Sequence, residues 1–469
     1  MAFSRAGPEM TALDAAPAEA PPKAPTLAEA TAVWARIGLL SFGGPAGQIA
    51  LMHRELVEER RWIAESRFLH ALNFCMLLPG PEAQQLATYI GWLLHGTRGG
   101  VIAGTLFVLP GFVVILALST AYALFQESSW VASLFFGLKA AVLAIVIEAV
   151  MRVGRRALRN GVMLAIAATA FLALFVFAVP FPLVVLAAAI FGYAGSRIYP
   201  NLFAANGHGR VTEDRPSVIG PTFPNSPRGS LATSRIVAAL IALWVTPLLA
   251  VGALVGWSSS FAALWLFFSQ MAVVTFGGAY AVLAYVAQEA VQHFGWLQPG
   301  EMVDGLALAE TTPGPLVLVL SFVGFLAAFR APAGLDPLLA GILGATLTTW
   351  VTFVPCFLWI FLGAPHVERL RANKALSAAL ATITAAVVGV ILNLAVWFGL
   401  HVLFAEVATF RLGPLAIAAP QWASIDLAAV ALSLVAAICL LRLRLGILAT
   451  LTICGVLGVL VTLMPLAPP

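Results

Sequence analysis

Charged side chains are scarce in this sequence. Asp, Glu, Lys and Arg make up 10% of the 469 residues, 61% are hydrophobic, and the mean hydropathy is +0.97. Soluble domains contain about 25% charged residues, so the composition excludes a soluble protein and predicts an all-α polytopic membrane protein. The arginines cluster at membrane edges rather than along one polar face, which excludes nucleic acid as a partner.

Catalytic and cofactor-binding motifs are also missing. No set of His, Asp and Glu has metal-ligand spacing, no Ser–His pair shares a predicted helix face, and no Walker loop is present. These absences predict a protein that is not an enzyme, needs no metal or other cofactor and is not driven by ATP. The four cysteines lack metal spacing and are interpreted as small core residues: Cys75, Cys356, Cys439 and Cys454.

Two polar stretches divide the chain. Residues 1–25 are rich in Ala, Pro and Glu and lack the apolar core of a signal peptide, so they are predicted to form a disordered tail. Residues 198–234 are rich in Pro, Gly, Asn and Ser and are predicted to form a linker. The apolar remainder divides into a first unit at 26–197, an additional transmembrane helix at 235–257 and a second unit at 258–469.

A Pro-Gly-Pro motif at residues 79–81 separates two apolar runs, each too short to cross a bilayer. Proline ends a helix and suits the first turn of the next, so a new helix is predicted to begin at Pro81. Its N-terminus would offer free N–H groups and partial positive charge, which suit an anion. Glu82 stands in this first turn and is interpreted either as a titratable gate or as a cap of its own helix.

Both helix breaks occur twice. The Ser-Phe-Gly-Gly motif at 41–44 recurs as Thr-Phe-Gly-Gly at 275–278, and Pro-Gly-Pro at 79–81 recurs at 313–315, each 234 residues later. Further residues match at the same offset: Glu55 with Glu289, and Trp62 with Trp296. The chain is therefore predicted to contain two copies of one unit. Broken segments at matching positions in two halves point to the binding site of a transporter.

The basic residues differ between the copies. Arginines flank the first broken segments, whereas residues 236–329 contain no Lys or Arg. By the positive-inside rule, the first edges face the cytoplasm and the second edges face away. We therefore predict two inverted repeats, with broken or re-entrant helices meeting near the membrane midplane and with the N-terminus and central linker cytoplasmic. Whether the broken pairs are re-entrant or fully spanning stays open, and the latter would change the number of crossings.

These motifs resemble those of the chromate ion transporter family in its long, two-domain form. The resemblance rests on residues 41–45 and 78–87 in the first half, and on 276–280 and 312–315 in the second. It implies a multi-pass inner-membrane protein that exports chromate by secondary active transport, coupled to the proton gradient or the membrane potential. Its partners would be chromate or a similar oxyanion, protons and the lipid bilayer. The sequence leaves two alternative functions open, a sulfate-type oxyanion transporter and a passive anion channel. A homodimer is also possible.

Chromate is a tetrahedral dianion, which needs hydrogen-bond donors and positive potential. Four predicted helix N-termini, which follow the glycines of the breaks, would supply both. The substrate-binding candidates are Ser41, Gly43, Gly44, Pro79, Gly80, Pro81, Gln84, Thr275, Gly277, Gly278, Thr312 and Gly314, with Arg36 as a fixed positive charge. Gln85 and Thr311 are further possible donors in the same breaks. Each hydroxyl has the alternative of bonding to its own helix, and Arg36 that of extending to the interface.

The proton-coupling or gating candidates are Glu82, Glu148, Glu310 and Lys139. Lys139 and Glu148 are nine residues apart on a predicted helix and are not expected to pair. Glu310 precedes the second Pro-Gly-Pro motif, where the first copy has Met76, so the repeat is asymmetric there. The matched pair Glu55 and Glu289 is expected to be solvated, and the matched tryptophans are expected to anchor at the membrane interface.

Overall fold

The computed structural model describes residues 22–203, 214–220, 230–276, 278–364, 373–412 and 415–463. Within these residues, six helices are long and apolar enough to cross a membrane: Glu82–Phe125, Ser129–Ala157, Phe181–Ile198, Thr233–Leu254, Pro337–Gly363 and Ala375–Leu403. The predicted all-α polytopic membrane fold is therefore confirmed. Most of the predicted tail, parts of the predicted linker and Gly277 lie outside the described residues.

The first half contains two broken segments and three longer helices. Its elements are α1 (Leu27–Leu40), α2 (Gly44–His53), the π-helix η1 (Arg54–Glu59), α3 (Glu65–Cys75), α4 (Glu82–Phe125), α5 (Ser129–Ala157), α6 (Gly161–Phe175), α7 (Phe181–Ile198) and α8 (Pro200–Phe203). Helix α4 is interrupted by non-helical backbone at His95 and Gly96, so a short helix precedes its long apolar part.

The second half repeats this order after α9 (Ser230–Leu254), which begins inside the predicted linker. Its elements are α10 (Ser260–Val274), α11 (Ala279–Gln288), the π-helix η2 (Glu289–His293), α12 (Pro299–Thr311), η3 (Leu316–Leu318), α13 (Val319–Arg330), α14 (Pro337–Gly363), α16 (Lys374–Leu403), η5 (Trp422–Ser424), α17 (Leu427–Ala437), the π-helix η6 (Ile438–Arg442) and α18 (Ile447–Leu463). A two-stranded antiparallel hairpin, β1 (Val407–Leu412) and β2 (Leu415–Pro420), was not anticipated from the sequence.

The two halves share local detail at the 234-residue offset. Helices α2 and α11 both continue into a π-helical turn. After that turn, the amide of Trp62 bonds to the carbonyl of Leu56 at 2.7 Å, and the amide of Trp296 bonds to that of Ala290 at 2.8 Å. The same backbone path therefore occurs in both halves. Both tryptophans lie buried in the protein core, which corrects their expected place at the membrane interface.

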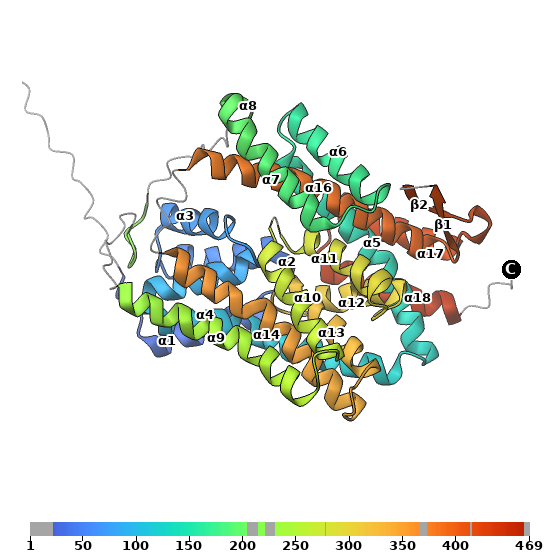
Figure 1. Cartoon of the computed structure of the whole chain (residues 1–469), viewed down its shortest axis with the longest axis horizontal. Helices are drawn as coiled ribbons and strands as arrows, with labels where there is room; N and C mark the ends of the chain where they lie inside the picture. The colour runs from blue at the N-terminus through green and yellow to red at the C-terminus, as the bar shows by residue number, and fades with distance from the viewer. Residues whose placement is uncertain are drawn as a thin grey trace, which may run out of the picture.

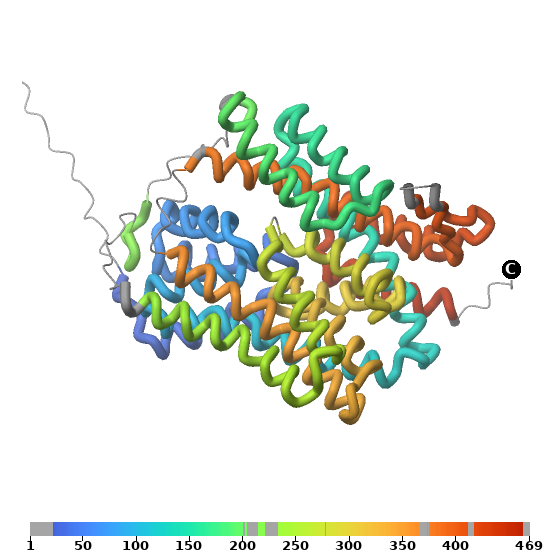
Figure 2. Tube along the Cα trace, in the orientation of Figure 1, coloured from blue at the N-terminus to red at the C-terminus, as the bar shows by residue number. Residues whose placement is uncertain are grey.

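The halves are interleaved rather than separated into lobes. Helix α5 of the first half packs on α17 and α18 of the second, while α16 of the second packs on α6 and α7 of the first. Figure 2 shows the same exchange at the other end, where the orange α14 lies beside the blue α4. The short helices α2, α10, α11 and α12 lie in the middle of the molecule (Figure 1). Motion of one half must therefore alter contacts with the other.

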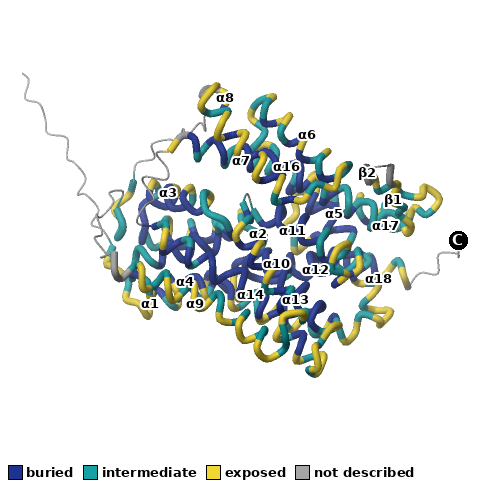
Figure 3. The backbone as a smooth tube through the Cα atoms, in the orientation of Figure 1, coloured by how far each residue is buried: buried dark blue, intermediate teal, exposed yellow. Residues whose placement is uncertain are grey.

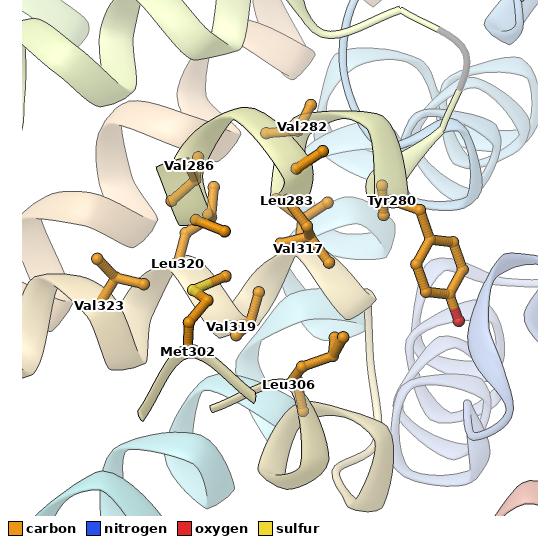
Figure 4. Packing of buried hydrophobic residues seen from close by; sticks show 14 of the residues in the cluster. Tyr280, Val282, Leu283, Val286, Met302, Leu306, Val317, Val319, Leu320 and Val323 are labelled. Carbon is orange, nitrogen blue, oxygen red and sulfur yellow. The ribbon is translucent and has the colours of Figure 1, made fainter. Parts of the chain in front are cut away.

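Burial follows this arrangement. Figure 3 shows the central helices α11 and α12 mostly buried and the outer faces of α6, α7 and α9 mostly exposed. Large apolar side chains such as Leu186, Phe191 and Leu249 are exposed on those outer helices. A soluble protein rarely exposes so much apolar surface, whereas lipid contact makes it favourable. In the centre, aliphatic side chains of α11, α12 and α13 pack on one another, with Tyr280 to one side (Figure 4).

Candidate functional site

Two reciprocal backbone hydrogen bonds join the breaks of the two halves. The amide of Gly80 donates to the carbonyl of Thr275 at 2.8 Å, and the amide of Gly314 donates to the carbonyl of Ser41 at 2.8 Å. Residue 314 is 234 positions after 80, and 275 is 234 positions after 41. Each bond therefore joins the residues that correspond, in the other half, to the two residues of the other bond. We call this region, residues 41–48, 79–85, 275–276, 278–280 and 310–316, the crossing.

The crossing forms because each half supplies what the other lacks. Ser41 and Thr275 are the C-caps of α1 and α10, where helical carbonyls have no partner within the helix. The glycine amides of the opposite Pro-Gly-Pro turns bond to these carbonyls. Gly80 has φ +120° and Gly314 has φ +88°, a region that favours glycine. A Cβ on Gly80 would lie 2.8 Å from Cys356 Sγ, so the approach also requires the absence of a side chain.

Several helix N-termini meet here. Helices α2, α4 and α11 begin at the crossing without a side-chain cap, as does η3. Glu82 Oε1 at the start of α4 lies 3.9 Å from where a Cβ on Gly278 would stand. Gln48 Nε2 in the first turns of α2 donates to the carbonyl of Gly314 at 2.6 Å. Helix N-termini carry free N–H groups and partial positive charge, which suit an anion.

The hydroxyl candidates bond to their own helices. Ser41 Oγ donates to the carbonyl of Ile37 at 2.6 Å, and Thr275 Oγ1 donates to that of Met271. Thr311 and Thr312 donate to the carbonyls of Leu308 and Ala309, at 2.8 and 2.9 Å. The local alternative is therefore the one adopted in this conformation. These hydroxyl protons are therefore not free for another acceptor in this conformation.

Three buried glutamines come from the first half only. Gln84 Nε2 lies 3.1 Å from Thr88 Oγ1, Gln85 Nε2 donates to the carbonyl of Pro79 at 2.6 Å, and Gln48 reaches Gly314. All three amide oxygens are buried without a hydrogen-bond partner in the described part of the chain. Sequence reasoning missed Gln48, although its position one turn after Gly44 was the available signal. Val282, Leu318 and Val319 occupy the matching positions in the second half, so the two sides of the crossing differ in polarity.

Two of the predicted carboxylates lie at the crossing. Glu82 is half-buried and has no ion pair or hydrogen-bonded side chain among the described residues. Glu310 is buried, and its Oε1 accepts a hydrogen bond from Tyr280 Oη at 2.7 Å. Tyr280, in the first turn of α11, was not predicted as a site residue. The crossing thus combines positive helix ends with two ionisable acids.

The other charged candidates have partners elsewhere. Arg36 Nη2 lies 3.5 Å from Glu55, and the Arg36 side chain is 55% exposed. Glu148 pairs with Arg152 one turn later, and Lys139 Nζ lies 3.3 Å from Asp304, so Lys139 and Glu148 do not pair with each other. Glu55 is 1% exposed and also contacts Arg60, which corrects its expected solvation. Among the described residues, the three charged candidates Arg36, Glu148 and Lys139 form no ion pair with a residue of the crossing.

Fold and site together define a polytopic helical membrane protein whose two related halves meet at interrupted helices. The model of the chromate transporter family matches residues 28–193 and 262–459, and the two segments begin 234 residues apart. The chain therefore belongs to the chromate transporter family. Because this is a family of transporters, the prediction that the chain is not an enzyme is confirmed.

Curated relatives cover most of the chain. A chromate transport protein of Pseudomonas aeruginosa is 32% identical over 361 residues, which is 76% of this chain and 77% of that protein. A probable chromate transport protein of Synechococcus elongatus is 29% identical over 392 residues, 84% of this chain and 89% of that protein. A chromate transport protein of Cupriavidus metallidurans is 29% identical over 369 residues, 78% of this chain and 81% of that protein. No solved structure matches the chain.

Proposed function

We propose that this chain moves chromate, or a related tetrahedral oxyanion, out of the cell across the inner membrane by secondary active transport. The observation that carries the proposal is the crossing, where uncapped helix N-termini of both halves meet beside two acids. The relatives from Pseudomonas aeruginosa and Cupriavidus metallidurans, which are named chromate transport proteins, support the choice of substrate. We also propose that the halves are inverted, with the N-terminus and linker in the cytoplasm.

The backbone binds the anion in this proposal. First-turn amides of α2, α4, α11 and η3 replace part of the water around the oxyanion, and the helix ends supply positive potential. The contribution of Ser41, Thr275 and Thr312 then comes from their backbone and from their position where α1, α10 and α12 end. Gln84 adds an adjustable amide that can present either its oxygen or its NH₂ group.

Glu82 acts as the gate. An ionised carboxylate 3.9 Å from the Gly278 Cβ position competes with the substrate for the same positive helix end. Protonation removes this competition, so the anion and the ionised carboxylate occupy the site in turn. Glu310, held by Tyr280, provides a second acid from the opposite half. The membrane potential favours export, because an inside-negative potential drives a dianion outward by about 4.6 kcal/mol per 100 mV.

The proposal is tested with purified protein in sealed lipid vesicles. Radiolabelled chromate is added, and a pH difference and a K⁺ diffusion potential are imposed separately. Accumulation of chromate against its gradient, driven by the pH difference at zero potential, is the expected result. Flux that follows only the anion gradient and the voltage would identify a passive channel. Preferential accumulation of labelled sulfate would instead make the substrate sulfate-like.

A further inference from the structure

Helix α12 carries three acidic residues along its length, whereas the matching helix α3 has one, Glu65, in its first turn. Its three carboxylates and their counterparts 234 positions earlier are Glu301 with Arg67, Asp304 with His70, and Glu310 with Met76. Glu301 and Asp304 are three residues apart and share a face, while Glu310 lies about 9 Å further along the axis, at the crossing. The repeat therefore keeps the helix but changes its charge, and only α12 offers acids between its N-terminal end and the crossing.

Apart from Glu55, which pairs with two arginines, Asp304 is the most buried described acid that the transport proposal does not use. It is 3% exposed, its Oδ2 accepts a hydrogen bond from Tyr122 Oη at 2.9 Å, and Lys139 Nζ lies 3.3 Å from the same oxygen. Its other oxygen, Oδ1, is buried and has no hydrogen-bond partner in the part of the chain that the structure describes. A buried carboxylate oxygen without a donor is costly when the group is ionised.

The surrounding charges leave Lys139 as the cation that faces Asp304. Glu301, one turn earlier on α12, pairs with Arg330 of α13 through Oε1 and Nη2 at 2.5 Å. Arg330 also donates to the carbonyl of Trp296 at 2.9 Å, so its guanidinium is directed toward Glu301 and Trp296. The uncharged Tyr122 hydroxyl completes the surroundings of Asp304 from α4. The Lys139 side chain is 29% exposed, so the cluster is not closed on this side.

We propose that Asp304 carries a proton during transport, an inference that rests on the proposed coupled transport. The proton adds to the free Oδ1 and leaves from it, so that Asp304 changes between carboxylate and carboxylic acid with no other bond made or broken. A metal cation would be repelled by the Lys139 ammonium and would need several further oxygen ligands, whereas a proton needs only the free Oδ1, so the ligand of this site is a proton. Protonation weakens the ion pair with Lys139.

This ion pair connects the two halves. Lys139 and Tyr122 belong to α5 and α4 of the first half, whereas Asp304 belongs to α12 of the second. Weakening the pair reduces the attraction between interleaved elements that must move relative to one another during transport. Proton binding at Asp304 therefore couples to the relative position of the halves, and Glu310 lies at the crossing end of the same helix.

The test uses full-length protein in vesicles and compares Asp304→Asn with the double variant Lys139→Met/Asp304→Asn. The double variant removes both charges, so it leaves no unpaired buried cation. Asp336→Asn, which changes an exposed carboxylate that caps α14, is the matched control. Two fluxes are measured: chromate accumulation driven by a pH difference at zero potential, and one-for-one exchange of labelled against unlabelled chromate.

In Asp304→Asn we expect pH-driven accumulation to fall roughly tenfold, within the range of typical site-to-site coupling. Exchange should persist in at least one of the two Asp304 variants, and Asp336→Asn should keep both fluxes. Wild-type pH response retained in both Asp304 variants would overturn the inference while leaving the transport proposal intact. Loss of exchange in both variants, in protein that remains monodisperse, would also overturn it by making the pair structural. A wild-type protein that shows no pH-driven flux would overturn proton coupling itself, and this inference with it.

Discussion

The amide of Gly314 lies 2.8 Å from the carbonyl oxygen of Ser41, and the equivalent pair 234 residues away, Gly80 and Thr275, has the same separation. Two equivalent hydrogen bonds thus run in opposite directions between segments that are far apart in sequence. Each half therefore donates one of the two bonds and accepts the other. The two bonds that hold this junction together are made by backbone atoms alone.

The glycine at this junction should be irreplaceable. Gly314→Val introduces strain of about 1–2 kcal/mol at φ +88° and places a Cβ 3.3 Å from the carbonyl oxygen of Phe107. We expect vesicle transport to be lost because the Gly314 amide no longer reaches Ser41. Gly334→Val is the matched control, since its φ is +87° but no atom lies within 4 Å of the added Cβ. Equal transport loss in both variants would mean that backbone strain, not the crossing, is responsible.

Removing the ionisable group of Glu82 should uncouple chromate transport from the pH difference. Glu82→Gln keeps the shape of the side chain but can no longer alternate between an anion and a neutral acid. We expect pH-driven chromate flux to fall by about tenfold, or about 1.4 kcal/mol, at normal protein level. Glu127→Gln, on the exposed turn after α4, is the control and should behave as wild type. Unchanged chromate resistance in cells that express Glu82→Gln would contradict the gate role.

The buried ion pair at Glu55 should matter for stability. Glu55 is 1% exposed and contacts Arg36 and Arg60, while its repeat partner Glu289 is half-buried and has no ion pair among the described residues. Glu55→Ala should lower the free energy of unfolding by about 1–3 kcal/mol, at the lower end because both arginines reach solvent. Glu289→Ala should cost less. Thermal denaturation in detergent compares them, and equal melting temperatures would contradict a structural role for Glu55.

Much of this architecture was predictable because helix breaks and membrane spans are local properties. Pro-Gly-Pro and paired glycines force a break wherever they occur, so both breaks, their offset and the presence of Glu82 and Glu310 beside them could be predicted. Partners from distant segments were not predictable. Asp304 and Tyr122 are 182 positions apart, and neither lies in a motif. Glu55 was predicted as solvated because charge at a helix end is usually exposed, whereas tertiary packing buried it here.

The inverted arrangement can be tested at a matched pair of surface positions. Glu59 and His293 are both exposed and stand 234 residues apart, on the π-helices η1 and η2. The four native cysteines are free and buried, so they should react little with a membrane-impermeant thiol reagent. We expect Glu59→Cys to be labelled only from the cytoplasmic side and His293→Cys only from the opposite side, because arginines surround the first position and none lies near the second in sequence. Labelling of both variants from one side would make the repeats parallel and would overturn the proposed inverted arrangement.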